Sequence, residues 1–585
     1  MTDNHDGITV RRDTFLDQVF SRAELQNVIF AEAPRRADLL RLAVSVSREA
    51  TPIRLRVHRN HPFEFIASLL QPFCAYDWRR INVEIGDYDD SLSFILNGNA
   101  DIELIWLDYE RYKLAPEALS DWLKSRVEAL HAATRAPILV AAWPSHANGA
   151  ANFNASLRAW TMDLPGVRIM PIDEVADALG NDYHDQRMSG IGGTQLSERA
   201  NVTLARLLGL SWLPAALRPR LKAVVFDLDN TLWGGVLGED GQDGVLVGQG
   251  YDLLQEKAAN LAQSGLFVGV LSRNEPEDVE AMFASGRMKL LAQSVSARSV
   301  SWGSKAEGMA EIAKTLRIGF DSILFVDDNP GELAAVATGC PGIHLLHAKP
   351  DPRETCRALN HYPGLFSFGL DATDSLRSSD LSSNDARQSL RSATVDHNEY
   401  VASLELELRV ALNPARYRSR LHQLSQKTNQ FNLALRRLSE TDVSDVISAS
   451  DRHVVAIWMT DKFSNSGLIA AMFVSSDGQG TLCVDELCIS CRALGRGVED
   501  LMVVTAIDAA VVELAANCSI PIKQVRFHTQ RGPRNDPARA WLEAFTGHAL
   551  GENEIAAIAW TDTARIERAR ALPVRIKQGE PHENE

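Results

Sequence analysis

The chain has few cysteines, no excess of positive charge and no long apolar run, and each shortage excludes a class of protein. Seven cysteines in 585 residues are sparse and odd in number, which favours a reducing cytoplasm over a disulfide framework. The formal net charge of −16 argues against nucleic acid or an anionic membrane as the main partner. No apolar run is long enough to span a bilayer, and residues 1–6 are too polar for a secretory signal. We therefore expect a cytoplasmic globular protein.

The composition is that of a folded chain too long for one hydrophobic core. Hydrophobic residues make up 45% and charged residues 23% of the sequence, as in globular proteins, and the length predicts about three or four domains. We see no repeat. We predict an α/β chain of three domains, at 1–218, 219–350 and 401–585, with a connector over 351–400 that contains a polar stretch rich in Ser, Asp and Arg.

The first two predicted domains show β/α alternation, which is typical of a parallel sheet. In the first, a helix over about 13–47 precedes strand-like runs at 53–57, 81–85, 102–106 and 138–142, with helices at 63–73 and 120–134. A helix over 200–208 is expected to stop at Gly209, before a proline-containing linker. In the second, strands are expected at 223–227, 267–271, 290–292 and 322–326, with a helix at 253–264.

Two further features complete the outline. The glycine-rich stretch at 234–241 predicts a β-hairpin flap after the first strand of the second domain. In the third domain, strands are expected at 454–459, 468–474, 481–489 and 525–529, with an apolar helix at 498–514.

The strand at 223–227 delivers two aspartates, Asp227 and Asp229, to the loop that follows it. Side chains two residues apart on an extended backbone point the same way. Open α/β sheets bind ligands at the carboxyl ends of their strands. Taken alone, the pair fits an Asp-Asn turn about as well as it fits a functional site.

Three later motifs decide between these interpretations, since each falls at a predicted strand end or in a loop. They are the segments 271–274, 301–305 and 325–330, which contain Ser272, Lys305 and Asp327. A carboxylate nucleophile can form an aspartyl-phosphate, while a hydroxyl and a lysine hold the phosphoryl oxygens. A second acid protonates the leaving oxygen and later activates water, and Mg²⁺ prefers carboxylate and water ligands.

These four motifs, in this order, resemble the haloacid dehalogenase-like phosphatase superfamily. The resemblance implies that Asp227 is the nucleophile and Asp229 the general acid/base. It implies phosphoryl contacts from Asn230, Ser272, Arg273, Asn274 and Lys305. It also implies Mg²⁺ ligation by Asp227, Asp327, Asp328 and the backbone carbonyl of Asp229.

The gaps between the motifs are short: 45 residues separate Asp227 from Ser272, and 22 separate Lys305 from Asp327. Neither gap holds a large lid domain. We therefore expect a site with a small flap that is open to bulky substrates, including a group carried on another protein, unless the N-terminal domain acts as a lid.

The flanking sequences narrow the resemblance. The segments 231–241, 427–432, 461–468 and 490–499 together resemble the FkbH-like proteins, which are associated with polyketide and related biosynthesis. This resemblance implies that a glyceryl unit from 1,3-bisphosphoglycerate, a small phosphorylated metabolite, loses phosphate and is delivered to an acyl carrier protein thiol. Before residue 220 the match is loose and is to flavodoxin-like or SGNH-hydrolase-like domains.

The third domain contains Arg492-x-x-Gly495-x-Gly497 between a predicted strand and a helix. Glycines there let backbone amides face an anion at the helix N-terminus, although glycine turns before helices are also common. The run resembles the coenzyme A pyrophosphate loop of GNAT acetyltransferases, and a phosphopantetheine-bearing carrier would suit the same groove.

Cys491 stands just before this run. A nearby helix start would favour its thiolate, which could hold an acyl group as a thioester; the alternative is a small buried residue. Asn429 and Gln430, with His528 and Asn535 near the last strand, are candidates for the acyl or carrier pocket. The alternative for the 427–432 segment is a helix cap and turn.

The N-terminal domain lacks the catalytic pattern of an SGNH hydrolase. No serine follows its first strand, and Asp182 and His184 are only two residues apart. We therefore expect a scaffold or docking role there. Two alternatives remain for the whole chain: a phosphatase of a small phosphorylated metabolite without acyl transfer, and a carrier-docking scaffold.

Overall fold

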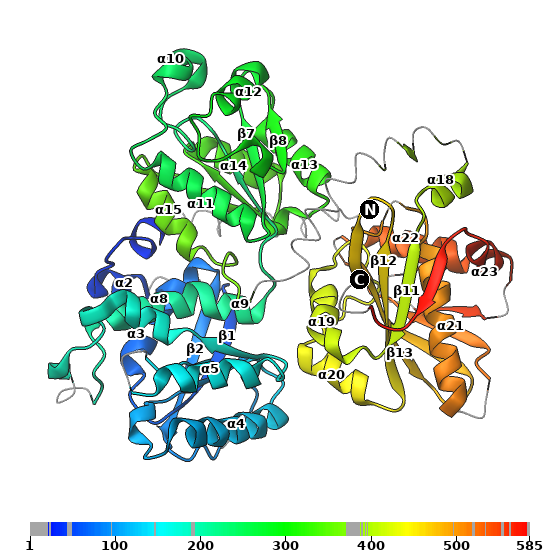
Figure 1. Ribbon diagram of the computed structural model, residues 1–585, viewed down its shortest axis with the longest axis horizontal. Helices are drawn as coiled ribbons and strands as arrows, with labels where there is room; N and C mark the ends of the chain where they lie inside the picture. The colour runs from blue at the N-terminus through cyan, green and yellow to red at the C-terminus, as the bar shows by residue number, and fades with distance from the viewer. Residues whose placement is uncertain are drawn as a thin grey trace, which may run out of the picture. The chain divides into compact units, whose positions relative to one another are not determined.

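The structure is a computed structural model. It describes residues 22, 25–43, 49–94, 96, 98–144, 148–188, 193–369, 387, 390–391, 394, 396–494, 496–517, 521–532, 534–551, 555–560 and 563–581. The chain divides into two compact units, Met1–Leu370 and Asp371–Glu585 (Figure 1). The predicted boundaries at 218, 350 and 400 stay predictions.

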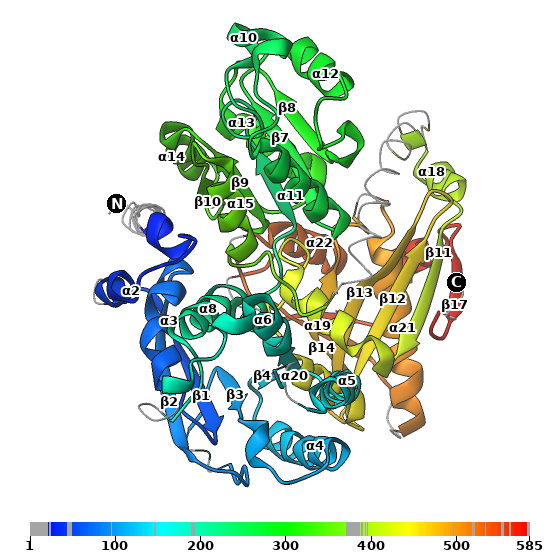
Figure 2. The same cartoon turned by 60° about the vertical axis from the view of Figure 1, so that its left-hand side comes forward.

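The first parallel sheet lies in the N-terminal part of the first unit, with strand order β2-β1-β3-β4-β5. Helices cover both of its faces, which is why β3 is buried along its whole length. Helices α4 and α5 pack on one face, while α3 covers the other and packs against α8 (Figure 2). The bounds are β1 (Thr51–Arg59), β2 (Arg79–Tyr88), β3 (Ile102–Trp106), β4 (Ile138–Ala141), β5 (Val167–Met170), α2 (Arg36–Ala43), α3 (Glu64–Tyr76), α4 (Pro116–Ala133), α5 (Ala150–Thr161), α6 (Ile172–Leu179) and α8 (Glu198–Leu207).

The second parallel sheet of this unit has the order β10-β9-β6-β7-β8. Helix α11 packs on one face, and α13 and α14 pack on the other. All of its strands are parallel, but β7 and β8 are added on one side of β6 and β9 and β10 on the other. The change of side between β6 and β9 is the kind of switch point at which open α/β sheets bind ligands. The bounds are β6 (Ala223–Phe226), β7 (Phe267–Ser272), β8 (Ala297–Val300), β9 (Ile323–Asp327), β10 (His344–His347), α9 (Leu213–Leu217), α10 (Leu237–Gly244), α11 (Tyr251–Gln263), α12 (Pro276–Ala284), α13 (Lys305–Leu316), α14 (Pro330–Gly339) and α15 (Pro352–His361).

The two sheets of the first unit share one hydrophobic core, which runs from Leu25 to Leu365. Polar contacts join them as well: Arg218 donates to Asp77 at 2.6 Å, and Gln26 donates to the carbonyl of His347 at 2.6 Å. The N-terminal sheet is therefore built into the same unit as the sheet whose strand ends carry Asp227 and Asp327.

Four predictions for this unit are wrong. The helix expected over about 13–47 is interrupted, because residues 31–35 are not helical and α2 begins at Arg36. Residues 237–244 form α10 instead of a hairpin, since Asp240 accepts the amide of Val236 at 2.8 Å and closes a local turn. The strand expected at 290–292 is replaced by a turn, and β8 begins at Ala297. Gly209 does not end its helix, because helical backbone continues to Leu217. A Cβ on Gly209 would lie 2.7 Å from the Cβ of Phe73, so this glycine permits close packing.

The continuous helix Glu198–Leu217 is, among the described residues, the one stretch that is long and apolar enough to cross a membrane by length and composition alone. Its mean hydropathy is 1.2, and 72% of its most apolar stretch is buried inside the unit. This burial, against α3, is that of a core helix.

The second unit contains a mixed sheet of order β16-β15-β14-β13-β12-β11-β17. Neighbouring strands are antiparallel except for the pairs β14–β15 and β11–β17. Helix α21 covers one face, and α19 and α20 cover the other (Figure 1). The bounds are β11 (Glu407–Leu412), β12 (Arg452–Thr460), β13 (Asn465–Ser476), β14 (Thr481–Ile489), β15 (Gln524–His528), β16 (Ile555–Ala559), β17 (Arg575–Gln578), α18 (His397–Ser403), α19 (Arg418–Lys427), α20 (Glu440–Ser448), α21 (Glu499–Asn517), α22 (Asp536–Thr546) and α23 (Thr563–Arg570). The predicted α/β class is confirmed.

Candidate active site

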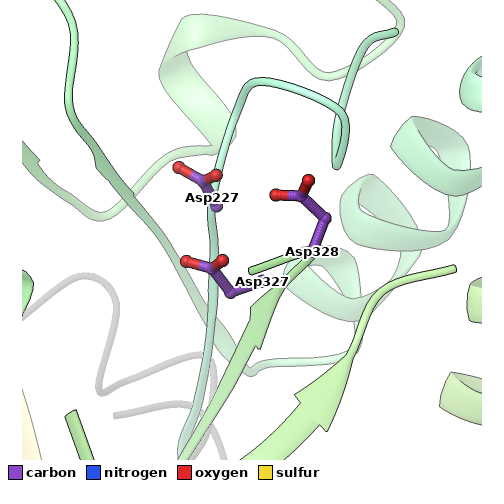
Figure 3. A group of neighbouring side chains, drawn as sticks. All are labelled: Asp227, Asp327 and Asp328. Atoms are coloured by element: carbon purple, nitrogen blue, oxygen red, sulfur yellow. The ribbon is translucent and has the colours of Figure 1, made fainter. Parts of the chain in front are cut away.

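Three carboxylates meet where the adjacent strands β6 and β9 end. Asp227 follows β6, Asp327 is the last residue of β9, and Asp328 comes next. The amide of Asp227 donates to the carbonyl of Val326 at 2.9 Å, which sets the two strand ends side by side. One oxygen from each carboxylate lies within 4.8 Å of the other two, around the common space seen in Figure 3.

Lys305 is the cation of this cluster. It is the first residue of α13, whose N-cap Ser304 accepts the amide of Ala306 at 3.2 Å. Its Nζ lies 3.0 Å from Asp227 Oδ1 and 2.6 Å from Asp327 Oδ2. The lysine therefore bridges two of the three acids in a site where its own side chain is only 6% exposed.

Burial and neighbouring charges together shift the pKa values of this cluster. It raises the pKa of Asp227 to about 7, against the opposing effect of the Lys305 ammonium and with the support of Asp327. Burial also raises the pKa of Asp328, and the Asp327 carboxylate adds to that shift. Although burial alone lowers it, the pKa of Lys305 is raised by Asp227 and Asp327. The cluster holds more negative than positive charge and is suited to a cation.

A second, hydrogen-bonded group adjoins the carboxylates. Asn274 Nδ2 donates to Asp229 Oδ2 at 2.9 Å and to Ser272 Oγ at 3.1 Å. Ser272 ends β7, the strand beside β6, and is 2% exposed. Four predicted positions, Asp229, Ser272, Asn274 and Lys305, thus lie at one edge of the sheet with the acids, and their roles stay predictions.

Two other predicted phosphoryl contacts point to different partners. Asn230 has a φ of +52°, and its exposed side chain accepts the amide of Gly235 at 3.0 Å. Arg273 pairs with Glu332 at 2.9 Å and its side chain is 46% exposed. Both side chains are exposed to solvent, and their phosphoryl contacts stay predictions.

The three carboxylates form a donor set that fits Mg²⁺, which takes carboxylate oxygens and keeps several waters.

Residues 193–369 are described without a gap, and within them neither the β6–β7 nor the β8–β9 connection contains a further sheet. The small flap and the lack of a large cap therefore hold for this part of the chain.

Sequence reasoning missed two neighbours of the site. His347, at the end of β10, hydrogen-bonds through Nε2 to the backbone carbonyl of Asp328 at 2.9 Å. Trp233, in the flap, donates to Asp229 at 2.8 Å. The position of His347 at the end of a strand could have indicated its place near the site. Nothing in the sequence indicates that the indole of Trp233 pairs with Asp229.

In the second unit, the predicted carrier site contains Cys491 and the glycines that follow it. The prediction that Cys491 stands at a helix start is wrong: it lies half-buried in a turn after β14, and α21 begins at Glu499. Gly495 lies outside the described residues. Gly497 has a φ of +73°, and a Cβ there would lie 2.2 Å from the ring of His397, so a close approach requires this glycine.

Part of the motif at 461–468 has a structural explanation. Asp461, whose side chain is fully buried, pairs with Arg387 at 2.8 Å and with Arg496 at 2.9 Å. Its Oδ1 also accepts the amides of Phe463 and Ser464. Since Arg496 belongs to the turn that carries Arg492, which is 6% exposed, this ion-pair cluster holds that turn against the loop before β13.

The remaining predicted positions lie beside β14, some at its end and His528 near its middle. The amide of Ile489 donates to the carbonyl of Phe431 at 2.9 Å, which brings the 429–432 segment to within two residues of Cys491. Asn429 accepts from Arg437 at 2.7 Å, and Gln430 is exposed. Asn535 is fully buried and donates to the carbonyl of Asn432 at 2.9 Å. His528, 42% exposed, lies 3.9 Å from Asp485.

Comparisons with known proteins give distant structural likenesses. No protein-family model matches the chain, and no curated protein matches it. Among solved structures, the N-terminal part of protein BF1531 from Bacteroides fragilis, which contains a phosphatase domain complexed with Mg, is 19% identical with a TM-score of 0.46. That match covers 56% of this chain and 98% of the other. A GCN5-related glucosamine N-acetyltransferase region of a fungal multi-domain GH3 β-N-acetylglucosaminidase is 10% identical, with a TM-score of 0.17, over 91% of this chain and 67% of the other. The resemblance to FkbH-like proteins stays a prediction.

Proposed function

We propose that the first unit is a Mg²⁺-dependent phosphatase that works through an aspartyl-phosphate at Asp227. The observation that carries this proposal is the cluster in which Lys305 bridges Asp227 and Asp327, with Asp328 beside them and Ser272 and Asn274 on the neighbouring strand end. A carboxylate nucleophile next to a buried cation is what attack on an anionic phosphoryl group needs.

The reaction is proposed to run in two displacements. An Asp227 oxygen bonds to phosphorus while the bond from phosphorus to the leaving oxygen breaks, and Asp229 gives that oxygen its proton. Water then bonds to phosphorus, its proton goes to Asp229, and the bond between phosphorus and Asp227 breaks. Lys305 and Ser272 bind the phosphoryl oxygens in both steps.

Asp227, Asp327, Asp328 and the carbonyl of Asp229 would hold the Mg²⁺ ion. When bound, the ion supplies positive charge that offsets repulsion between the nucleophile and the phosphoryl group. The chain's own lysine supplies one positive charge against three carboxylates, which supports a need for a further cation.

Phosphate release with Mg²⁺ tests this proposal. We expect Asp227→Asn to abolish phosphate release from a small phosphorylated metabolite, while Asp278→Asn, at an exposed position on α12, leaves it unchanged. Retained release in Asp227→Asn would refute the assignment of the nucleophile.

We further propose that the second unit passes a glyceryl group to an acyl carrier protein thiol in the cytoplasm, as part of polyketide or related biosynthesis. Support comes from Cys491, which stays partly exposed beside the buried Arg492, and from the ion-paired turn that holds both. The thiolate sulfur would bond to the acyl carbon of 1,3-bisphosphoglycerate, and the bond from that carbon to the acyl phosphate would break. Asp227 would then remove the phosphate of the remaining ester.

Intact-mass spectrometry after incubation with 1,3-bisphosphoglycerate and Mg²⁺ tests the transfer. We expect a glyceryl adduct that disappears in Cys491→Ala and persists in Cys488→Ala. Cys488 is a fitting control because it is fully buried, and burial raises the pKa of its thiol well above the usual range. Steady phosphate release without an adduct would identify a plain phosphatase, and carrier binding without phosphate release would identify a docking scaffold.

A further inference from the structure

The carboxylate of Asp229 accepts hydrogen bonds from three donors. Its Oδ1 accepts the indole Nε1–H of Trp233 at 2.8 Å and the backbone amide of Leu237 at 3.0 Å. Its Oδ2 accepts the side-chain amide of Asn274 at 2.9 Å. The flap therefore binds one oxygen of this acid, and the strand end that carries Ser272 binds the other.

Trp233 is itself fixed in place. It is fully buried, and its amide donates to the carbonyl of Leu228 at 3.2 Å in a tight turn. The buried side chain of Gln255 donates to the carbonyl of Leu232 at 2.7 Å and accepts the amide of Lys289 at 2.7 Å. Since the turn is anchored on both sides, the direction of the indole N–H is set before any substrate arrives.

The two oxygens of Asp229 consequently differ. Two donors occupy Oδ1, whereas Oδ2 has one, and that donor is the Asn274 amide that also contacts Ser272 Oγ at 3.1 Å. Oδ2 is therefore the oxygen on the side of the phosphoryl-binding serine. It keeps lone-pair capacity for a proton, because a carboxylate oxygen can accept about two hydrogen bonds.

We propose that Trp233 is a positioning residue that, together with the Leu237 amide, anchors Oδ1 so that Oδ2 is the atom that gives and takes the catalytic proton. This inference rests on the proposed phosphatase function. In the first displacement the proton leaves Oδ2 for the leaving oxygen; in the second, Oδ2 receives the proton of the attacking water.

Leaving-group dependence separates positioning from a general structural role. Poor leaving groups need the proton from Asp229, whereas 4-nitrophenolate leaves with little help. In Trp233→Phe, which removes the N–H and keeps an aromatic ring, we expect kcat/KM to fall about 10- to 100-fold for an alkyl phosphate. For 4-nitrophenyl phosphate we expect a fall of under about threefold. The matched control is Trp212→Phe, at a buried tryptophan in the helical segment Leu208–Trp212, for which we expect no change in this ratio.

A second variant protects the test against misfolding. Leu237 is the first residue of α10, where proline is tolerated. Val236 before it has φ −115° and ψ 113°, which a following proline allows. Leu237→Pro therefore removes the other donor to Oδ1, and we expect the same selective loss for the alkyl phosphate.

An equal loss for both substrates, or no loss for either, in the folded variants would overturn the positioning role of Trp233. That outcome is distinguishable from failure of the phosphatase proposal. If Asp227→Asn still abolishes phosphate release, the nucleophile assignment stands while the inference on Trp233 falls. If Asp227→Asn retains release, the phosphatase proposal itself falls.

Discussion

The most informative single change is Lys305→Met, which removes the ammonium and keeps most of the side-chain volume. Lys305 pairs with Asp227 at 3.0 Å and with Asp327 at 2.6 Å. The two acids have side chains that are 6% and 0% exposed, so water offers little compensation. Breaking a buried ion pair by removing one partner destabilises a protein by about 3–5 kcal/mol, and we expect a loss of this size at pH 8 without Mg²⁺.

The loss should depend on pH with a definite sign. Burial already raises the pKa of Asp227 from 3.8 to about 7, and Lys305 is the main group that opposes this rise. Without the lysine the folded-state pKa rises further, so the folded variant binds more protons than the unfolded chain between pH 4 and the new pKa. Its stability therefore falls as pH rises through that window. We expect the variant to be closer to the unmodified protein at pH 5.5 than at pH 8.

Urea denaturation of the full chain, followed by tryptophan fluorescence, measures this effect. The control is Lys314→Met, at an exposed position on the same helix, which should change stability by less than about 0.5 kcal/mol. Adding Mg²⁺ should recover part of the loss, since a cation bound to the folded state at 100 times its Kd contributes about 2.7 kcal/mol. Equal midpoints for the two variants at pH 8 without Mg²⁺ would show that the buried bridge contributes nothing.

Two further predictions concern the second unit. Burial raises the pKa of Glu486 from 4.5 to about 7, so the folded unit binds the extra proton. The stability of the unit should therefore fall by about 3 kcal/mol in total as pH rises from about 5 to about 8. Hydrogen-exchange protection in β14, taken relative to the intrinsic exchange rate at each pH, that stays constant across this range would contradict the prediction. Asp461→Asn leaves two buried arginines without their carboxylate and should destabilise the unit by about 3–5 kcal/mol. The surface pair of Asp508 and Arg570, changed by Asp508→Asn, should give about 1 kcal/mol or less in the same urea titration.

The sequence predicts best the strands that are buried along most of their length, because such strands appear in the sequence as apolar runs. The runs at 102–106 and 481–489 coincide with β3 and β14. β3 is buried at every position, and β14 at seven of nine. The meeting of Asp227 with Asp327 was predictable for a related reason. Parallel strands direct their carboxyl ends to one edge, so acids that follow neighbouring strands converge whatever the loops do.

The errors arise where a residue's role depends on a distant partner. Gly209 has the composition of a helix stop, but its neighbour Phe73 lies 136 positions away and makes it a packing residue. The distance between Cys491 and the helix start depends on how the ion pairs of Asp461 hold the intervening turn. Spacing along the chain contains neither contact.

The surroundings of Asp227 and Asp229 suit the two different tasks that we propose for these identical side chains. Asp227 lies among full charges, with Lys305 at 3.0 Å and the other acids close by, so its ionisation responds to any cation that enters. Asp229 lies among neutral donors: an indole, a backbone amide and an asparagine. A nucleophile benefits from neighbours that neutralise its charge, whereas a group that loses and regains a proton in each cycle benefits from fixed dipoles that leave one oxygen accessible. Because the two residues are only two positions apart, the tight turn through Trp233 is what keeps these environments separate.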